Sequence, residues 1–308
     1  MAKPSEIIFF GTGTSGCVPN IFCLTEDNPS CKVCLSTLAP LPQEPGLAPI
    51  FSKNRRRNTS AMVRYLHSDG QTRNILIDAG KTFWASALTW CTNYKLRKLD
   101  AVILTHGHAD AVMGLDDLRQ WTSANVQDKV DVYCDASTLA VVSSAFPYMV
   151  DTKKATGSGE VAAVQFHLIE RDENGDMIPF WLDELKVVPF EVEHGKALDK
   201  PYYALGYRFG DLTYISDTNS IPDRALDIID GSSVLVIDAL RLKEHSSHLS
   251  FEQAYNLCLK VLKAPARAFF TGFTHDLDHE EIEKWISEQP QVEGITIKGA
   301  YDGQRITL

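Results

Sequence analysis

Short apolar runs alternate with polar, glycine-containing turns along most of the chain. Runs of this kind, rich in Val, Ile, Leu and aromatic residues, predict buried strands. The expected strands cover residues 7–10, 61–66, 75–77, 101–104, 130–134, 161–169, 185–192, 202–209, 212–215, 234–237, 268–271, 295–301 and 305–308. Helical spacing predicts helices over residues 81–94, 136–146 and 222–229, and capping residues begin two more at Ser250 and at Asp278. This alternation indicates an α/β fold.

The stretch that follows the expected strand at 101–104 carries the strongest candidate chemistry. His106, His108 and Asp110 alternate along what is expected to be an extended loop, and apolar residues at helical spacing follow Gly114. Imidazole and carboxylate together suit zinc, and less strictly manganese or iron. A polar turn with solvent-exposed histidines is the alternative. The strand before the motif and the helix after it favour a metal site.

The order strand, Thr-His-x-His-x-Asp, helix resembles the metallo-β-lactamase superfamily, whose signature is His-x-His-x-Asp-His. The resemblance covers residues 7–302 and implies a four-layer αββα sandwich formed by a single domain over residues 1–308, with a Cys-rich insertion at about 17–57. It also implies that the last two strands, 295–301 and 305–308, close the second sheet.

The resemblance further assigns roles to other strand-end residues. It implies His194 as the third histidine of the first metal, Asp217 as a bridging ligand and Asp78 as a brace for the metal loop. Two histidines of the family's second metal site are absent, because Ala111 and Gly272 stand at their positions. The expected content is therefore one catalytic zinc, with a weak second ion such as Mn²⁺ as the alternative.

A second cluster of ligands lies in the cysteine-rich loop. The Cys31-x-x-Cys34 pair, with Cys23, fits either half of a zinc site or a redox pair. The prolines that follow at residues 40, 42, 45 and 49 favour a loop and a structural zinc. The chain is most similar here to PhnP-type phosphodiesterases, and this resemblance implies His275 as the fourth ligand. A rival interpretation places His275 in the catalytic site, in place of the histidine missing at Gly272.

Two further residue types bear on catalysis. His248 precedes the helix cap at Ser250 and is the expected general acid, although His245 competes for this role; Asp110 is expected to orient the attacking water. The basic run at residues 53–60 is typical of a solvated loop. The resemblance makes Arg57 a candidate for binding an anionic substrate.

Composition limits the remaining classes of function. The 308-residue chain carries a formal charge of −10, which disfavours non-specific nucleic-acid binding. Its seven cysteines, the polar N-terminus and the lack of an apolar run of about 20 residues predict a cytoplasmic protein with no membrane span. The sequence leaves the oligomeric state open.

The resemblance implies a metal-dependent hydrolase. We expect a phosphodiesterase that acts on small or cyclic phosphodiesters. A tRNA 3′-processing type of endoribonuclease, with RNA as its partner, and a non-catalytic metal-binding relative are the alternatives.

Overall fold

Two seven-stranded sheets pack face to face in the computed structural model, which describes residues 2–123, 126–156 and 161–308. The first sheet has the strand order β14-β1-β2-β3-β4-β5-β6 and the second β13-β12-β11-β10-β9-β8-β7. The strands are β1 Pro4–Gly11, β2 Ser60–Leu66, β3 Thr72–Ile77, β4 Ala101–Ile103, β5 Val130–Cys134, β6 Val164–Leu168, β7 Phe180–Leu182, β8 Leu185–Ala197, β9 Lys200–Phe209, β10 Leu212–Ile215, β11 Val234–Asp238, β12 Ala266–Thr271, β13 Ile295–Gly299 and β14 Arg305–Thr307.

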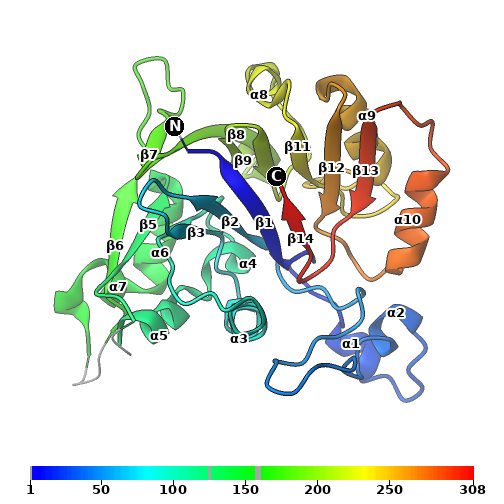
Figure 1. The fold of residues 1–308 in the computed structure, drawn as a ribbon, viewed down its shortest axis with the longest axis horizontal. Coiled ribbons are helices and arrows are strands. Elements are labelled where there is room, and N and C mark those ends of the chain that lie inside the picture. Colours follow the sequence, from blue (N-terminus) through cyan, green and yellow to red (C-terminus); the bar gives the residue numbers. More distant parts are fainter. Residues whose placement is uncertain (1, 124–125, 157–160) are drawn as a thin grey trace.

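Helices cover the outer face of each sheet, with one group on either side of the molecule (Figure 1). The helices are α1 Ile21–Leu24, α2 Lys32–Leu35, α3 Phe83–Tyr94, α4 Ala109–Val112, η1 Leu115–Leu118, α5 Arg119–Thr122, α6 Ala136–Ala145, α7 Pro147–Val150, η2 Thr152–Lys154, α8 Asp223–Ile229, α9 Phe251–Val261 and α10 His279–Ser287. Helix α3 packs on the first sheet, and α8, α9 and α10 pack on the second. The predicted four-layer αββα sandwich is therefore confirmed.

The continuous apolar runs arise because the central strands are buried on both faces. In β1, Ile7 and Phe9 point into the core between the sheets, whereas Ile8 and Phe10 point outward against the helix layer. All four side chains are fully buried. A run of this kind has no polar face, which explains why the sequence reads as a block of apolar residues.

Two predictions about the strands were wrong, one about the sheet that the last strand joins and one about where β8 ends. Strand β14 pairs antiparallel with β1 in the first sheet, so only β13 extends the second sheet. The chain reverses at Gly303, which has φ +85° and donates its N–H to the carbonyl of Phe9. Strand β8 runs five residues beyond the predicted end at 192, to Ala197, and its pairing register shifts between Glu193 and Lys196.

The predicted helix after Gly114 forms as two short pieces, η1 and α5. Strand β7 and the short helices α1, α2, α4 and α7 were not predicted, because segments of three or four residues carry little periodicity. The sequence also predicts a polar loop over residues 153–160; its first two residues belong to η2, and residues 157–160 lie outside the described residues. No helix in the described ranges has the length and apolar character needed to cross a bilayer.

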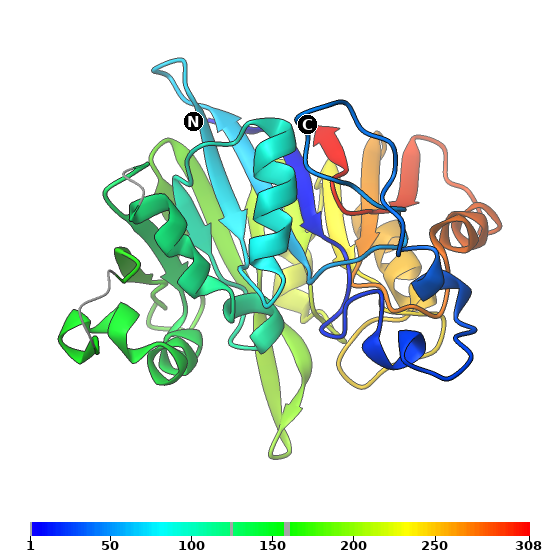
Figure 2. The ribbon, with the colours of Figure 1, turned by 90° about the horizontal axis from the view of Figure 1, so that it is seen from below.

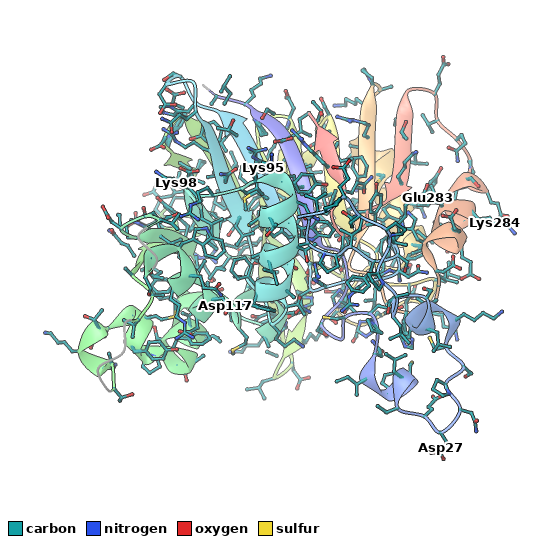
Figure 3. The ribbon with its side chains drawn as sticks, turned by 60° about the horizontal axis from the view of Figure 1, so that its bottom comes forward. Asp27, Lys95, Lys98, Asp117, Glu283 and Lys284 are labelled. Carbon is teal, nitrogen blue, oxygen red and sulfur yellow. The ribbon has the colours of Figure 1, made fainter. Side chains whose placement is uncertain are left out.

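The segment between β1 and β2, which carries the cysteine-rich loop, lies beside α10 at the end of the second sheet (Figures 1 and 2). Figure 3 shows Asp27 at its outer tip. The fully buried Arg56 holds the segment in place, since its guanidinium donates to the carbonyls of Thr274 and Leu277. This contact joins the cysteine-rich loop to the loop before α10.

Candidate metal centre

The candidate site lies where strands from both sheets end. A cleft of about 480 Å³ opens there. Its lining comprises Thr14, Ser15, His108, Ala109, Asp110, His194, Asp217, Leu240, Arg241, His245, Ser247, His248 and Thr274. Most of these residues follow the C-terminal ends of strands, where α/β sheets typically bind ligands.

Three imidazoles converge at the bottom of this region. The ligand nitrogens of His106, His108 and His194 lie within 4.8 Å of one another. His194 Nε2 lies 3.2 Å from His108 Nδ1 and 3.7 Å from Asp217 Oδ2, and His106 Nε2 lies 4.0 Å from the same carboxylate oxygen. These ligand atoms belong to residues that lie on or just after the strands β4, β8 and β10. They surround one point, as metal ligands do.

Hydrogen bonds on the far side of two rings fix their tautomers. The Thr105 hydroxyl donates to Asp78 Oδ2 at 2.7 Å, so it accepts from His106 Nδ1 at 2.8 Å. The Ser247 carbonyl can only accept, so His194 Nδ1 donates to it at 2.7 Å. Both Nε2 atoms are therefore unprotonated, and each presents a lone pair toward the cluster.

His106 Nε2 gives the clearest sign of a missing partner. It is buried and has no hydrogen-bond partner within the described part of the chain. Burial lowers the pKa of His106 to about 3, so the ring is neutral near pH 7. An inward lone pair without a donor is costly in the protein interior, and a divalent cation would satisfy it. The residues present thus fit a metal ion.

Asp217 and Asp110 differ in their surroundings. Burial alone would raise the pKa of Asp217, but His106, His248 and His194 lower it to about 2 overall. Burial and the charge of Asp217 raise the pKa of Asp110 to about 6. Asp110 lies in the first turn of α4, so the prediction of an extended loop through this residue was wrong. It lines the cleft but is absent from the His clusters.

The loop that carries these ligands packs closely on the end of β3. Asp78 adopts φ +59° and accepts from both the N–H and the hydroxyl of Thr105. The Ala79 N–H donates to the carbonyl of Ala111 at 2.8 Å. A Cβ on Gly80 would lie 1.7 Å from the carbonyl oxygen of Asp110, so only glycine permits this approach. Asp78 thus acts on the loop through Thr105.

The positions of the two missing histidines are filled differently. Ala111 is buried in the core under the first sheet. A Cβ on Gly272 would lie 2.7 Å from Asp238 Oδ1, so the Asp238 carboxylate occupies the adjoining space.

Asp238 Oδ2 binds His248 Nδ1 at 2.8 Å and accepts the N–H of Thr218 at 2.9 Å. Burial opposes protonation of His248, but Asp238 raises its pKa to about 9. His248 also groups with His194 and Asp217.

Gly272 offers a test of this crowding. Its φ is +83°, and Gly70 has nearly the same φ, +81°, but a methyl group added at Gly70 would meet no atom within 4 Å. Gly70→Ala should therefore cost about 1–2 kcal/mol of unfolding free energy, from the left-handed conformation alone. Gly272→Ala should cost at least about 3 kcal/mol, because the methyl group also overlaps Asp238. Urea unfolding of both variants checks this, and equal costs would show that position 272 is not crowded.

The cysteine cluster forms a second, separate group. The sulfur atoms of Cys23, Cys31 and Cys34 lie 3.5, 3.4 and 3.7 Å from His275 Nδ1, and the four ligand atoms lie within 4.8 Å of one another. The four residues thus come together as three thiols and one imidazole, the donor set of a closed zinc site. His275 does not line the cleft, although its neighbour Thr274 does.

Several site residues escaped prediction from the sequence. Tyr202 stacks on His108 with centroids 4.8 Å apart, and Asp238 binds His248. Arg241 is the arginine that lines the cleft. Arg57, by contrast, donates to the Thr89 hydroxyl and is not among the lining residues. The sequence signal for Arg241 was only its position just after a predicted strand, since loops at such ends often carry function.

Comparison with known proteins agrees with this arrangement. A model of the beta-lactamase superfamily domain matches residues 73–273, more than half of the chain, so the chain belongs to this superfamily. The resemblance drawn from its motifs is therefore confirmed. Its structure also resembles a diphosphatase of the PhnP family, with 29% sequence identity, a TM-score of 0.73 and coverage of 99% of this chain and 98% of the other.

Two structural matches with less than 25% sequence identity show the fold alone. Zinc-bound PqqB from Methylobacterium extorquens is 20% identical, with a TM-score of 0.67 over 98% of this chain and 100% of the other. A long-form RNase Z from yeast is 15% identical, with a TM-score of 0.61 over 99% of this chain and 41% of the other.

Among curated proteins, an octanoyltransferase of Porphyromonas gingivalis is 29% identical over 250 residues, which are 80% of this chain. The chain spans only 42% of that protein's length.

Proposed function

We propose that the chain is a zinc-dependent phosphodiesterase that acts on small phosphate esters. The superfamily consists largely of metal-dependent hydrolases, and the match to a PhnP-family diphosphatase favours phosphate esters within it. The observation that carries the proposal is the pair of inward Nε2 lone pairs on His106 and His194, next to the Asp217 carboxylate. The cleft beside them leaves room for a small substrate next to these groups.

In this proposal His106, His108, His194 and Asp217 hold one zinc ion. When bound, the zinc would lower the pKa of a water molecule and polarise a phosphoryl oxygen. Asp110, at the edge of the cleft, accepts a hydrogen bond from the attacking water and orients it. The absence of histidines at positions 111 and 272, with the Asp238 carboxylate against Gly272, favours one catalytic zinc over two.

His248 acts as the general acid. Its Nδ1 is bound to Asp238, which fixes the ring and leaves Nε2 to donate a proton to the departing oxygen. His245 also lines the cleft, but it is exposed, and its ring bonds to Ser247 of the same loop. The Asp238 partner therefore favours His248 over His245.

The remaining ligands, Cys23, Cys31, Cys34 and His275, bind a structural zinc ion in this proposal. A site of three thiolates and one imidazole leaves no position open for substrate. The substrate is a small phosphodiester, cyclic or linear. RNA is the less favoured partner, because the formal charge of −10 repels a polyanion.

Metal analysis with a substrate panel tests the proposal. Mass spectrometry of the purified chain should find about two zinc ions, one for each ligand cluster. The zinc-loaded protein should hydrolyse bis(p-nitrophenyl) phosphate and a 2′,3′-cyclic nucleotide faster than a labelled tRNA precursor. Faster cleavage of the tRNA would favour the endoribonuclease, and no turnover of any ester would contradict the proposed activity.

His248→Ala should retain both zinc ions but slow turnover of an alkyl phosphodiester by about 10²–10⁴-fold, because the general acid is lost. The loss should be much smaller for a p-nitrophenyl ester, whose leaving group needs no proton. Steady-state kinetics on both substrates check this, with His245→Ala as the companion variant. Equal losses on the two esters would point to a role in phosphate binding, and a larger loss in His245→Ala would transfer the acid role to that residue.

A further inference from the structure

Arg241 occupies a fixed place on the wall of the cleft. It lies in the loop between β11 and α9, just after Asp238. Its carbonyl accepts the N–H of Phe251 at 3.0 Å, and the neighbouring Leu240 N–H donates to Leu249 at 2.9 Å. These bonds close the loop at its base. The backbone of Arg241 is therefore held by the first residue of a capped helix.

The side chain of Arg241 lacks the partner that its charge requires. Its Nε is buried with no hydrogen-bond partner, and none of the described carboxylates lies within 4.0 Å of its guanidinium. Arg171 and Arg224, by comparison, both bind the carboxylate of Glu191, and the buried Arg56 donates to backbone carbonyls. Because an unpaired charge in a partly buried position is costly, Arg241 is expected to serve an anion that is not part of the protein.

Several other polar groups of the cleft already have roles in the proposed function, whereas Arg241 has none. Asp217, His108 and His194 belong to the proposed zinc site, and His248 to the leaving oxygen. Arg241 is the lone Lys or Arg among the residues that line the described cleft. His245 and His248 lie with their ring centroids 5.4 Å apart, and both line the cleft together with Arg241. The Arg241 guanidinium is therefore a positive charge in the cleft that is separate from the zinc ligands.

We propose that Arg241 binds a second phosphoryl group of the substrate, beside the one held at the zinc ligands. This inference rests on the proposed function and narrows its substrate class. A guanidinium donates two parallel hydrogen bonds to a phosphoryl group, which gives geometry as well as charge. The second group is either the neighbouring phosphoryl of a diphosphate or a terminal phosphate monoester on the same molecule.

The reaction balances for the diphosphate case. The water oxygen forms a bond to one phosphorus, and the bond from that phosphorus to the bridging oxygen breaks. The electron pair leaves on the bridging oxygen of the phosphoryl group bound by Arg241, and His248 protonates that oxygen. The proton lost by the water passes to Asp110. For a terminal monoester the same bonds change at the diester phosphorus, and Arg241 only binds.

A matched set of substrates tests the inference on the zinc-loaded full chain. The p-nitrophenyl ester of thymidine 5′-phosphate has one phosphoryl group, and its 3′-phosphorylated form has two. A dinucleoside diphosphate adds the P–O–P case. Wild type should prefer one of the two-phosphoryl substrates, and which one it prefers identifies the source of the second group.

Arg241→Gln should lower kcat/KM for the preferred two-phosphoryl substrate by about 10- to 100-fold, mainly through KM, the loss expected for one charge-assisted contact. The loss on the one-phosphoryl ester should be clearly smaller, and Arg241→Lys should restore part of the preference. Lys243→Gln, on the same loop but exposed and away from the cleft lining, should behave as wild type.

Two results would overturn the inference while leaving the proposed function intact. One is a wild type with no preference for a second phosphoryl group. The other is an equal loss on all substrates in Arg241→Gln, which would mark a structural role. No turnover of any phosphate ester by zinc-loaded wild type would instead contradict the proposed function, and this inference with it.

Discussion

His106→Ala should remove the catalytic zinc and nearly all turnover while leaving the fold intact. Removing a residue that only orients a ligand costs about 10–100-fold in metal affinity or activity, so loss of a ligand should exceed that range. The zinc content should fall from about two ions to about one, because the cysteine cluster is unaffected. Mass spectrometry and steady-state kinetics on the same preparation check both expectations.

Two companion variants make this result specific. Thr105→Val removes the hydroxyl that accepts from His106 Nδ1 but keeps the imidazole, so its loss should fall within the range of about 10–100-fold. His279→Ala removes another buried histidine, which lies on α10 outside every ligand cluster, and should lower stability without loss of zinc. If His106→Ala keeps its full zinc content and rate, the assignment of the motif at residues 106–110 as the metal loop is wrong.

Local patterns were enough to predict most of the strands, whereas the four layers were predicted from the family resemblance. Strands at residues 7–10 and 234–237 could be predicted without knowing which strands they pair with. Strands that are buried on both faces are apolar throughout, whichever neighbour they have. Strand β14 was assigned to the wrong sheet for the opposite reason. Its three residues are too few to identify the partner strand, and the turn at Gly303 places it beside β1.

The parts of the site that escaped prediction depend on contacts between remote segments. Asp238 and His248 are ten residues apart, and only the folded loop between them brings the carboxylate to the imidazole. The three arginines at 55–57 resemble a solvated run, yet Arg56 is buried against carbonyls at residues 274 and 277, and Arg57 turns toward Thr89. No local periodicity records such pairings, so a charge run in the sequence does not reveal which side chains reach the cleft.

The second large effect concerns the cysteine cluster. Cys31→Ser should remove about one zinc ion and lower thermal stability while turnover of the remaining folded protein persists, since a closed site contributes to folding and not to chemistry. Each kcal/mol lost should lower the melting temperature by roughly 2–4 °C. The site joins the loop before α2 to the loop before α10, so its loss leaves fewer contacts between these two segments, among them the bonds of Arg56 and the Asn54–His279 bond. Thermal unfolding with metal analysis measures both effects.

Cys17→Ser is the matched control, because Cys17 lies in the same segment but outside the cluster, and it should keep both zinc ions. His275→Ala decides between the two interpretations of that histidine. As a structural ligand it should reproduce Cys31→Ser, with one zinc lost, a lower melting temperature and retained turnover. Its Nδ1 lies within 3.7 Å of all three sulfur atoms, and its side chain does not line the cleft, which is why we expect this result. If His275→Ala abolishes turnover in folded protein while Cys31→Ser does not, His275 belongs to the catalytic site instead.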